Sequence, residues 1–217
     1  MIVEQRIRDY LMSLEPEQGE LLEEISRKAL RDEVPIIKKE TGALLKTMVA
    51  AKRPRAILEV GTAVGYSALL MAGVMPEDCT ITTIEKYEPR IPVARENFRR
   101  AGEEARITLL EGDAEEILKT LSGPYDFIFM DAAKGQYIHW LPMILGLLPE
   151  GGILFSDNVL QDGDVVWSRY AVERRDRTIH ARMREYLFTL KHIEELETSI
   201  IPIGDGAAVS VKRGKEE

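Results

Sequence analysis

The chain of 217 residues has a single cysteine and no long apolar run. One cysteine, Cys79, excludes an internal disulfide framework. The apolar runs are short and lie between turn-forming residues, so the sequence predicts no membrane-spanning helix. The opening residues 1–6 lack the layout of a secretory signal peptide. We therefore expect a cytoplasmic protein with no membrane partner.

Positive charge is also scarce. The chain has 29 Lys and Arg against 37 Asp and Glu, a net charge of −8, which argues against general, sequence-independent binding of nucleic acid. No internal repeat, low-complexity tract or linker interrupts the sequence. We expect one domain over residues 1–217, with an N-terminal helical cap over 1–52 and an α/β core over 53–217.

The apolar spacing changes along the chain. Residues 2–14, 17–31 and 36–51 have apolar faces at helical spacing. Strands and helices then alternate, which predicts a parallel sheet with helices on both faces. The expected strands are 55–60, 80–85, 106–111, 125–130 and 150–156, and the expected helices are 66–74, 88–101, 113–121, 136–147 and 173–191. Two last apolar runs, 193–202 and 207–212, flank a glycine turn and predict an antiparallel hairpin that completes seven strands.

A glycine loop follows the first expected strand, in the pattern E-x-G-x-x-x-G from Glu59 to Gly65. The dinucleotide pattern G-x-G-x-x-G seats a pyrophosphate, which an acid just before the loop would repel. A carboxylate there could hold an ammonium or a sulfonium, and S-adenosylmethionine (AdoMet) has both. Glu85 ends the second strand, where a carboxylate can accept hydrogen bonds from ribose hydroxyls. The alternative is an ordinary strand–helix turn of an α/β protein.

Polar residues also follow two later strands. Asp131 and Lys134 come after strand 125–130, and Asp157 and Asn158 come after strand 150–156. Ligands of an open α/β sheet bind beyond the carboxyl ends of its strands, and the expected topology makes these strands neighbours. Three oxygen ligands around one point suit Mg²⁺ or another divalent cation. The alternatives are a helix cap, a turn and a solvated lysine.

Together these motifs resemble the class I AdoMet-dependent methyltransferases. More narrowly, they resemble the metal-dependent O-methyltransferases, the group that includes catechol and caffeoyl-coenzyme A O-methyltransferases. The matching motifs are Glu59–Ser67, Glu85, Gly112–Ala114, Asp131–Lys134 and Asp157–Asn158. The resemblance implies a Rossmann-like fold with a seven-stranded, mostly parallel sheet, the cofactors AdoMet and Mg²⁺, and a homodimer.

The resemblance also implies roles for single residues. Lys134 would be the general base, and the metal ligands would be Asp131, Asp157 and Asn158. The cofactor would be bound by Val34, Glu59, Gly61, Gly65, Ser67, Glu85, Asp113, Ala114 and Asp131.

A closer resemblance is to the bacterial tRNA 5-hydroxyuridine methyltransferases, which make 5-methoxyuridine at the anticodon wobble position. The motifs concerned are Val34–Ile37, Asp131–Tyr137, Asp157–Leu160, Arg174–Ile179 and Pro202–Gly206. A catechol and a 5-hydroxyuracil both present two adjacent oxygens, so one metal site could serve either acceptor. The resemblance therefore implies that the partner is a tRNA anticodon loop.

A basic segment could serve such a partner. Arginine suits phosphate geometry, and aromatic side chains stack on unpaired bases. The expected tRNA contacts are Arg169, Arg174, Arg175, Arg177 and His180, with stacking faces from Trp167, Tyr170 and Tyr137. Other hypotheses stay open: a solvated helix or dimer interface, a small phenolic or coenzyme A thioester acceptor, a non-enzymatic binding module, and an NAD-dependent oxidoreductase.

Overall fold

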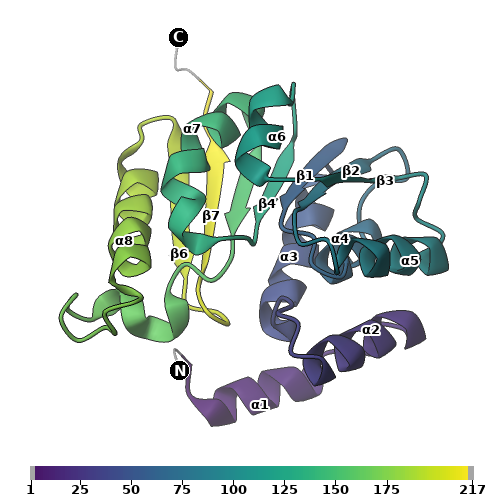
Figure 1. Cartoon of the computed structure of the whole chain (residues 1–217), viewed down its shortest axis with the longest axis horizontal. Coiled ribbons are helices and arrows are strands. Elements are labelled where there is room, and N and C mark those ends of the chain that lie inside the picture. The colour runs from purple at the N-terminus through teal and green to yellow at the C-terminus, as the bar shows by residue number, and fades with distance from the viewer. Residues whose placement is uncertain (1–2, 215–217) are drawn as a thin grey trace.

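The computed structural model describes residues 3–214 of the chain. Three N-terminal helices precede the sheet: α1 (Gln5–Leu14), α2 (Glu20–Arg31) and α3 (Lys39–Lys52). In the view of Figure 1, α1 and α2 lie below the rest of the molecule, and α3 rises beside α4 (Tyr66–Ala72). Position 2, where the first helix was expected to begin, lies outside the described residues. Within residues 3–214, no helix combines the length and the apolar character needed to cross a bilayer. The cytoplasmic location stays a prediction.

The predicted sheet is confirmed. Within the described part of the chain, seven strands form one sheet in the order β3-β2-β1-β4-β5-β7-β6 (Figure 1). The strands are β1 (Ala56–Val60), β2 (Thr80–Glu85), β3 (Ile107–Glu111), β4 (Phe127–Met130), β5 (Ile153–Ser156), β6 (Leu196–Ile201) and β7 (Ala207–Lys212). Strands β1 to β5 pair in parallel, and β7 pairs antiparallel with both β5 and β6. This arrangement is the Rossmann-like sheet with a C-terminal hairpin that the sequence predicted.

Helices cover both faces because successive strand side chains point to opposite sides. In β1, Ile57 packs in one core with α2 and α3, while Leu58 and Val60 pack in the other core. The first core also takes α4 (Tyr66–Ala72) and α5 (Ile91–Ala101). The second core takes α6 (Ala114–Thr120), α7 (Tyr137–Leu147) and α8 (Arg177–His192). The uninterrupted apolar runs of the strands are thus explained by burial on both faces.

The strand order places a cleft. The chain moves outward from β1 through β2 to β3 and then returns to β4 on the other side of β1. At such a switch point the loops after the two central strands diverge and leave a crevice for a ligand. The hairpin reaches the same edge, because antiparallel β7 begins where parallel β5 ends, with Ser156 paired to Ala208.

Several expected helices begin later than the apolar spacing predicted, among them α2 at Glu20, not at 17, and α5 at Ile91, not at 88. The third begins at Lys39, not at 36, and residues 34–38 are not helical. Pro35 disfavours the helical conformation in the residue before it. The arginine-rich helix begins at Arg177, not at 173. Two short 3₁₀ segments, η1 (Lys134–Gln136) and η2 (Gln161–Val166), were not predicted, since they are too short to show an amphipathic repeat.

Candidate active site

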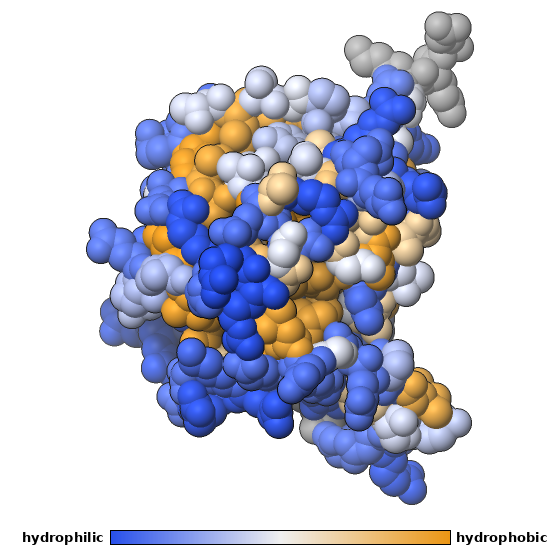
Figure 2. Space-filling view, turned by 90° about the vertical axis from the view of Figure 1, so that its right-hand side faces the viewer, coloured by the Kyte–Doolittle hydropathy of each residue, from blue (hydrophilic) through white to orange (hydrophobic). Residues whose placement is uncertain are grey.

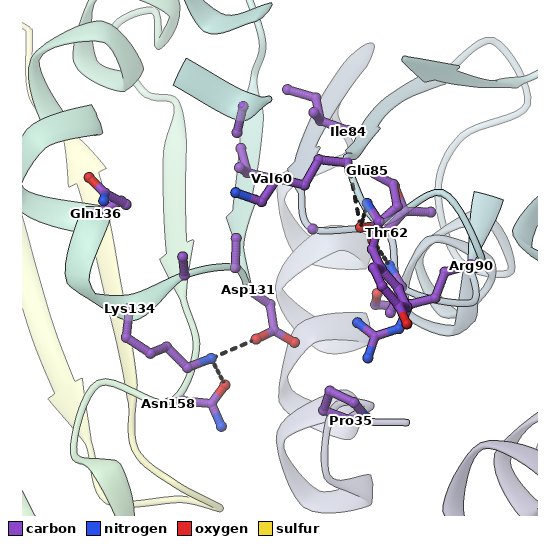
Figure 3. Close-up of a pocket in the computed structure, with 18 of the residues that line it drawn as sticks. Pro35, Val60, Thr62, Ile84, Glu85, Arg90, Asp131, Lys134, Gln136 and Asn158 are labelled. Atoms are coloured by element: carbon purple, nitrogen blue, oxygen red, sulfur yellow. Dashed lines mark hydrogen bonds and ion pairs between the residues drawn. The ribbon is translucent and has the colours of Figure 1, made fainter. Parts of the chain in front are cut away.

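A cleft of about 600 Å³ opens at the carboxyl ends of β1, β2 and β4 (Figure 3). Pro35–Lys38, which join α2 to α3, form part of its wall, so this segment is the part of the expected N-terminal cap that reaches the cleft. The cleft is lined by these residues that the sequence singled out: Gly61, Ser67, Glu85, Asp113, Ala114, Asp131, Lys134 and Asn158. Four others, Val34, Glu59, Gly65 and Asp157, lie beside or beneath it.

Gly61 brings two strand ends together. Its φ is +107°, and a Cβ on it would overlap the carbonyl oxygen of Asp131. Only glycine therefore allows the loop after β1 to lie against the end of β4. Gly65 has a different role from the one expected, because a Cβ there would collide with the ring of Phe98. Its lack of a side chain permits close packing of α4 against α5.

Glu85 lies at the end of β2 with its carboxylate at the cleft. Oε2 accepts a hydrogen bond from the amide of Ala63 at 2.7 Å, and Oε1 accepts from the amides of Lys86 and Tyr87 at 3.0 and 2.8 Å. These three bonds fix the carboxylate between the first two strand-end loops. A carboxylate has about four lone-pair positions, so Glu85 keeps capacity for a ligand hydroxyl.

Farther along the wall, Asp113 caps α6 by accepting from the amide of Glu115 at 2.9 Å. Its other oxygen lies 3.4 Å from Lys86 Nζ. The hydrogen bond from Glu115, stronger than the effect of burial, lowers the pKa of the Asp113 carboxyl. Asp113 and Ala114 thus form a fixed polar corner at this end of the cleft.

Glu59 lies near the end of β1, as expected, but its side chain points beneath the loop. Its side chain is fully buried under the loop and accepts hydrogen bonds from Ser67 Oγ at 2.6 Å and Thr83 Oγ1 at 2.5 Å. Thr83 in turn bonds Thr62 at 2.6 Å. Burial raises the pKa of Glu59 to about 8, against the two hydroxyl bonds that lower it. Glu59 therefore supports Ser67 and the loop from below, and its expected contact with a cationic ligand stays a prediction.

The other end of the cleft contains a cluster of oxygens around one cation. Lys134 Nζ donates to Asp131 Oδ1 at 2.9 Å and to the side-chain oxygen of Asn158 (Figure 3). Asp157 lies just beneath these residues and is buried. Its carboxylate accepts a hydrogen bond from the backbone amide of Asn158 at 2.7 Å. Burial and the nearby charge of Asp131 raise the pKa of Asp157 to about 7. The structure therefore brings the four predicted residues together.

Two residues of this end were missed as members of the site. The Asn158 amide nitrogen donates to Asp205 Oδ2 at 3.0 Å, and Asp205 forms an ion pair with Lys38. Burial raises the pKa of Asp205, but bonds from Asp162 and Lys38 outweigh this effect and hold the pKa below its ordinary value. The indication in the sequence was the motif Pro202–Gly206, which contains Asp205.

The basic segment divides into exposed and buried groups. Arg169, Arg174 and Arg175 are exposed, as are Trp167 (62% exposed) and Tyr170 (84% exposed). Other basic residues hold the backbone: Arg177 donates to the carbonyl of Val172, Arg182 to that of Gly135 and Arg184 to that of Val165.

Two expected contacts in this region are corrected. His180 is buried, and its Nε2 lies 3.2 Å from the carbonyl oxygen of Trp167, so it supports the segment and does not face solvent. Tyr137 is also buried. Its hydroxyl donates to the carbonyl of Met130 at 2.9 Å, so its ring is not a free stacking face.

Val34 lines a second cavity, of about 530 Å³, between α2 and α5. On the face that bears these helices, apolar surface shows between charged groups (Figure 2). Arg100 and Glu24 close part of the cavity rim with an ion pair at 2.5 Å. The side chain of Val34 therefore lies behind the loop after β1, while its neighbour Pro35 lines the cleft.

The fold and the cleft together define a Rossmann-like methyltransferase. The model of the O-methyltransferase family matches residues 12–213, so the chain belongs to that family and the predicted enzyme class is confirmed. A putative caffeoyl-CoA O-methyltransferase of Arabidopsis thaliana is 30% identical over 212 residues, which cover 92% of this chain and 90% of that protein. The catechol O-methyltransferase of Niastella koreensis is 35% identical over 130 residues, which cover 58% of each chain.

Solved structures agree. A putative caffeoyl-CoA O-methyltransferase from Staphylococcus aureus superposes with a TM-score of 0.89 at 32% identity, over 96% of this chain and 100% of the other. The SAH-bound methyltransferase of Podospora anserina superposes with a TM-score of 0.84 at 27% identity, over 96% and 94%.

The burial of Glu59 predicts a pH-dependent stability. Its folded pKa of about 8 exceeds its ordinary value of 4.5. Between these values the folded state keeps a proton that the unfolded chain has lost, so the free energy of unfolding falls as pH rises. Glu59→Gln imitates the protonated form. We expect its Tm to exceed the wild-type value most at about pH 8, with the difference shrinking toward about pH 5.

The control is Glu104→Gln, since Glu104 is exposed. Thermal unfolding followed by circular dichroism across this pH range measures all three proteins. A Tm difference between Glu59→Gln and wild type that stays constant with pH would contradict the buried, protonated carboxyl.

Proposed function

We propose that this chain is an AdoMet-dependent O-methyltransferase that uses a divalent cation and methylates one of two adjacent oxygens of its acceptor. The observation that supports it is the geometry of the cleft. Glu85 lies at one end and the oxygen cluster of Asp131, Asp157 and Asn158 lies at the other, with Lys134 beside it. The relatives include SAH-bound methyltransferases, which supports AdoMet as the cofactor.

The oxygen cluster fits a divalent cation. Its donors are two carboxylates and an amide oxygen, the ligand type that Mg²⁺ prefers. The Lys134 ammonium already contacts the cluster. Burial and then the nearby charge of Asp131 raise the pKa of Asp157, and a cation would offset that charge. Among residues 3–214 no group of three or more His, Cys, Asp or Glu side chains could hold a metal ion. The third donor of this cluster would be the side-chain oxygen of Asn158. The ligands would be Asp131, Asp157 and Asn158.

Methyl transfer is an in-line displacement of a sulfonium by an oxyanion, and the residues of the cleft would align the reactants. Glu85 would accept from the ribose hydroxyls, Asp113 and Ala114 would contact the adenine, and Gly61 and Ser67 would hold the methionine part. A divalent cation would lower the pKa of the acceptor hydroxyl and orient it.

Lys134 would take the proton of that hydroxyl. Its ammonium now donates to Asp131 and Asn158, so it would have to lose a proton and turn its lone pair to the acceptor first.

The relatives support a small phenolic acceptor, since those listed above are named for caffeoyl-CoA and catechol. A catechol offers two vicinal oxygens that could both contact one cation. A small catechol-type phenol is therefore the first candidate acceptor.

A second acceptor is favoured by the exposed surface of the segment 166–175. Trp167 and Tyr170 present their rings to solvent beside Arg169, Arg174 and Arg175. Exposed rings and arginine forks suit an unpaired nucleic-acid loop. The second candidate is therefore a tRNA bearing 5-hydroxyuridine at the wobble position, which would become 5-methoxyuridine.

We also propose that the chain forms a homodimer. The support is an apolar row on α1, where Ile7, Tyr10, Leu11 and Leu14 are about half exposed or more. A second copy would bury this row.

The proposed function is tested by transfer of a labelled methyl group from AdoMet, with Mg²⁺ or with EDTA. The acceptors are a small catechol, tRNA containing 5-hydroxyuridine, and the same tRNA with plain uridine. We expect EDTA to abolish labelling of the true acceptor. Labelling of the catechol alone supports the first acceptor, and labelling of the hydroxylated tRNA alone supports the second. Transfer that EDTA leaves unchanged would overturn the metal role.

Lys134→Ala tests the base. We expect kcat to fall about 100-fold or more, because a general base typically contributes that much. The dissociation constant of AdoMet, measured by calorimetry, should change little, since Lys134 lies at the acceptor end. Lys119→Ala, on the exposed side of α6, is the control. An equal loss of turnover and AdoMet affinity would refute the base role.

Charge reversal separates the two acceptors. With Arg174→Glu and Arg175→Glu combined, we expect kcat/KM for tRNA to fall about tenfold or more, because phosphate contacts are lost. Neutral catechol should be methylated at nearly the wild-type rate. The matched control reverses Arg95 and Arg99 on α5, which packs against β3 at the opposite edge of the sheet. An equal fall for both double variants would show that net charge alone is responsible.

A further inference from the structure

Asn158 has a side chain that can be turned the wrong way. Its amide has an oxygen on one side and an NH₂ group on the other. The oxygen can accept from Lys134 or bind a cation, whereas the NH₂ group would present two donors to a positive charge. A half turn of the amide would thus remove a ligand from the cluster. The site needs a group that decides between the two orientations.

Asp205 is such a group. Its Oδ2 lies 3.0 Å from Nδ2 of Asn158. An ionised carboxylate only accepts hydrogen bonds, so the amide must direct its NH₂ group toward Asp205. The amide oxygen then faces Lys134, as it does in Figure 3. The carboxylate of Asp205 therefore keeps the NH₂ group of Asn158 on its own side and the amide oxygen on the side of Lys134.

The backbone holds Asp205 in this place. Its carbonyl accepts from the amide of Leu160 at 2.9 Å, and the carbonyl of Gly206 accepts from the amide of Val159 at 2.9 Å. Gly206 has a φ of +88°, and a Cβ on it would overlap Leu160. The turn between β6 and β7 is thus joined to the loop after β5. It reaches this edge of the sheet because β7 is antiparallel to β5.

Lys38 holds the carboxylate of Asp205 from the other side. Its ammonium forms an ion pair with Asp205 and lies 3.4 Å from Asp162 Oδ1. Lys38 belongs to the segment 35–38, which lines the cleft. A charge-assisted bond of this kind is stronger than a neutral one. The side chain of Asp205 therefore links Lys38 of the N-terminal segment to Asn158 of the oxygen cluster.

We propose that Asp205, held by Lys38, is a positioning residue that keeps the oxygen of Asn158 directed into the cation site. The identity of the cation rests on the proposed function, whereas the orientation of the amide does not. Outer partners of this kind fix the geometry of the groups that contact a metal. The turn of the C-terminal hairpin thereby contributes Asp205 to the site, in addition to the pairing of β7 in the sheet.

The test is Asp205→Asn, which keeps the shape but lets the neighbour present either a donor or an acceptor. In metal-free protein labelled with ¹⁵N at asparagine, we expect the Asn158 side-chain amide signal to shift and its hydrogen exchange to accelerate at least tenfold. The signal is assigned from its absence in Asn158→Ala. Calorimetry with Mn²⁺ should show affinity about 10- to 100-fold weaker than wild type.

The control is Asp162→Asn, because Asp162 contacts Lys38 and Asp205 but not Asn158, and an asparagine amide there can still donate to Asp205. It should leave both the amide signal and Mn²⁺ affinity close to wild type. In the Asn158→Ala background, Asp205→Asn should weaken Mn²⁺ no further, since Asp205 acts through Asn158. Should Asp205→Asn not fold, Lys38→Met provides the same readouts with a smaller effect.

Unchanged Asn158 exchange and Mn²⁺ affinity in Asp205→Asn would overturn the proposal. So would a loss that the Asp162→Asn control reproduces, or one that persists undiminished in the Asn158→Ala background. A wild-type protein that binds no Mn²⁺ would instead contradict the cation of the proposed function, and the amide measurements would still decide the role of Asp205.

Discussion

The constraint on which this site depends is the crowding of negative charge at one edge of the sheet. Strands β4 and β5 end side by side, and the turn before β7 reaches the same place, so Asp131, Asp157 and Asp205 meet within a small volume. Like charges at partly buried positions destabilise each other unless cations lie between them. Lys134 offsets the charge on the inner side and Lys38 on the outer side. The same requirement explains why a divalent cation fits there.

The end of the cleft around Glu85 is organised by a different means, namely backbone hydrogen bonds and close packing. Gly61 allows the loop after β1 to touch the end of β4, and Glu85 gathers three backbone amides from two loops. Beneath them, the buried carboxyl of Glu59 bonds Ser67 and Thr83. Rigid hydrogen bonding thus fixes the walls before a ligand arrives, and such preorganisation favours alignment of the reacting atoms.

The acceptor end of the cleft has two parts: the oxygen cluster inside it and the exposed surface of segment 166–175 outside it. Under the proposed function, the oxygen cluster would suit any acceptor with two adjacent oxygens, whether phenol or modified base. The surface outside the cleft would then distinguish the acceptors; there Trp167 and Tyr170 are exposed, while His180 and Tyr137 are buried. Arg177 of α8 donates to the carbonyl of Val172 within that segment, and Arg184 donates to the carbonyl of Val165 just before it, so α8 holds the segment that bears the exposed arginines.

The sequence by itself determined the strands, the order of helices, the hairpin and most of the cleft residues, because apolar periodicity and strand-end polar residues are local properties. It placed Asp131, Asp157 and Asn158 together, since parallel strands end at one edge. Only the tertiary structure decided the direction and protonation of Glu59, which depend on which face of β1 packs against α4. It alone brought Lys38 and Asp205 to Asn158, because they are 167 residues apart and meet only through the antiparallel pairing of β7 with β5.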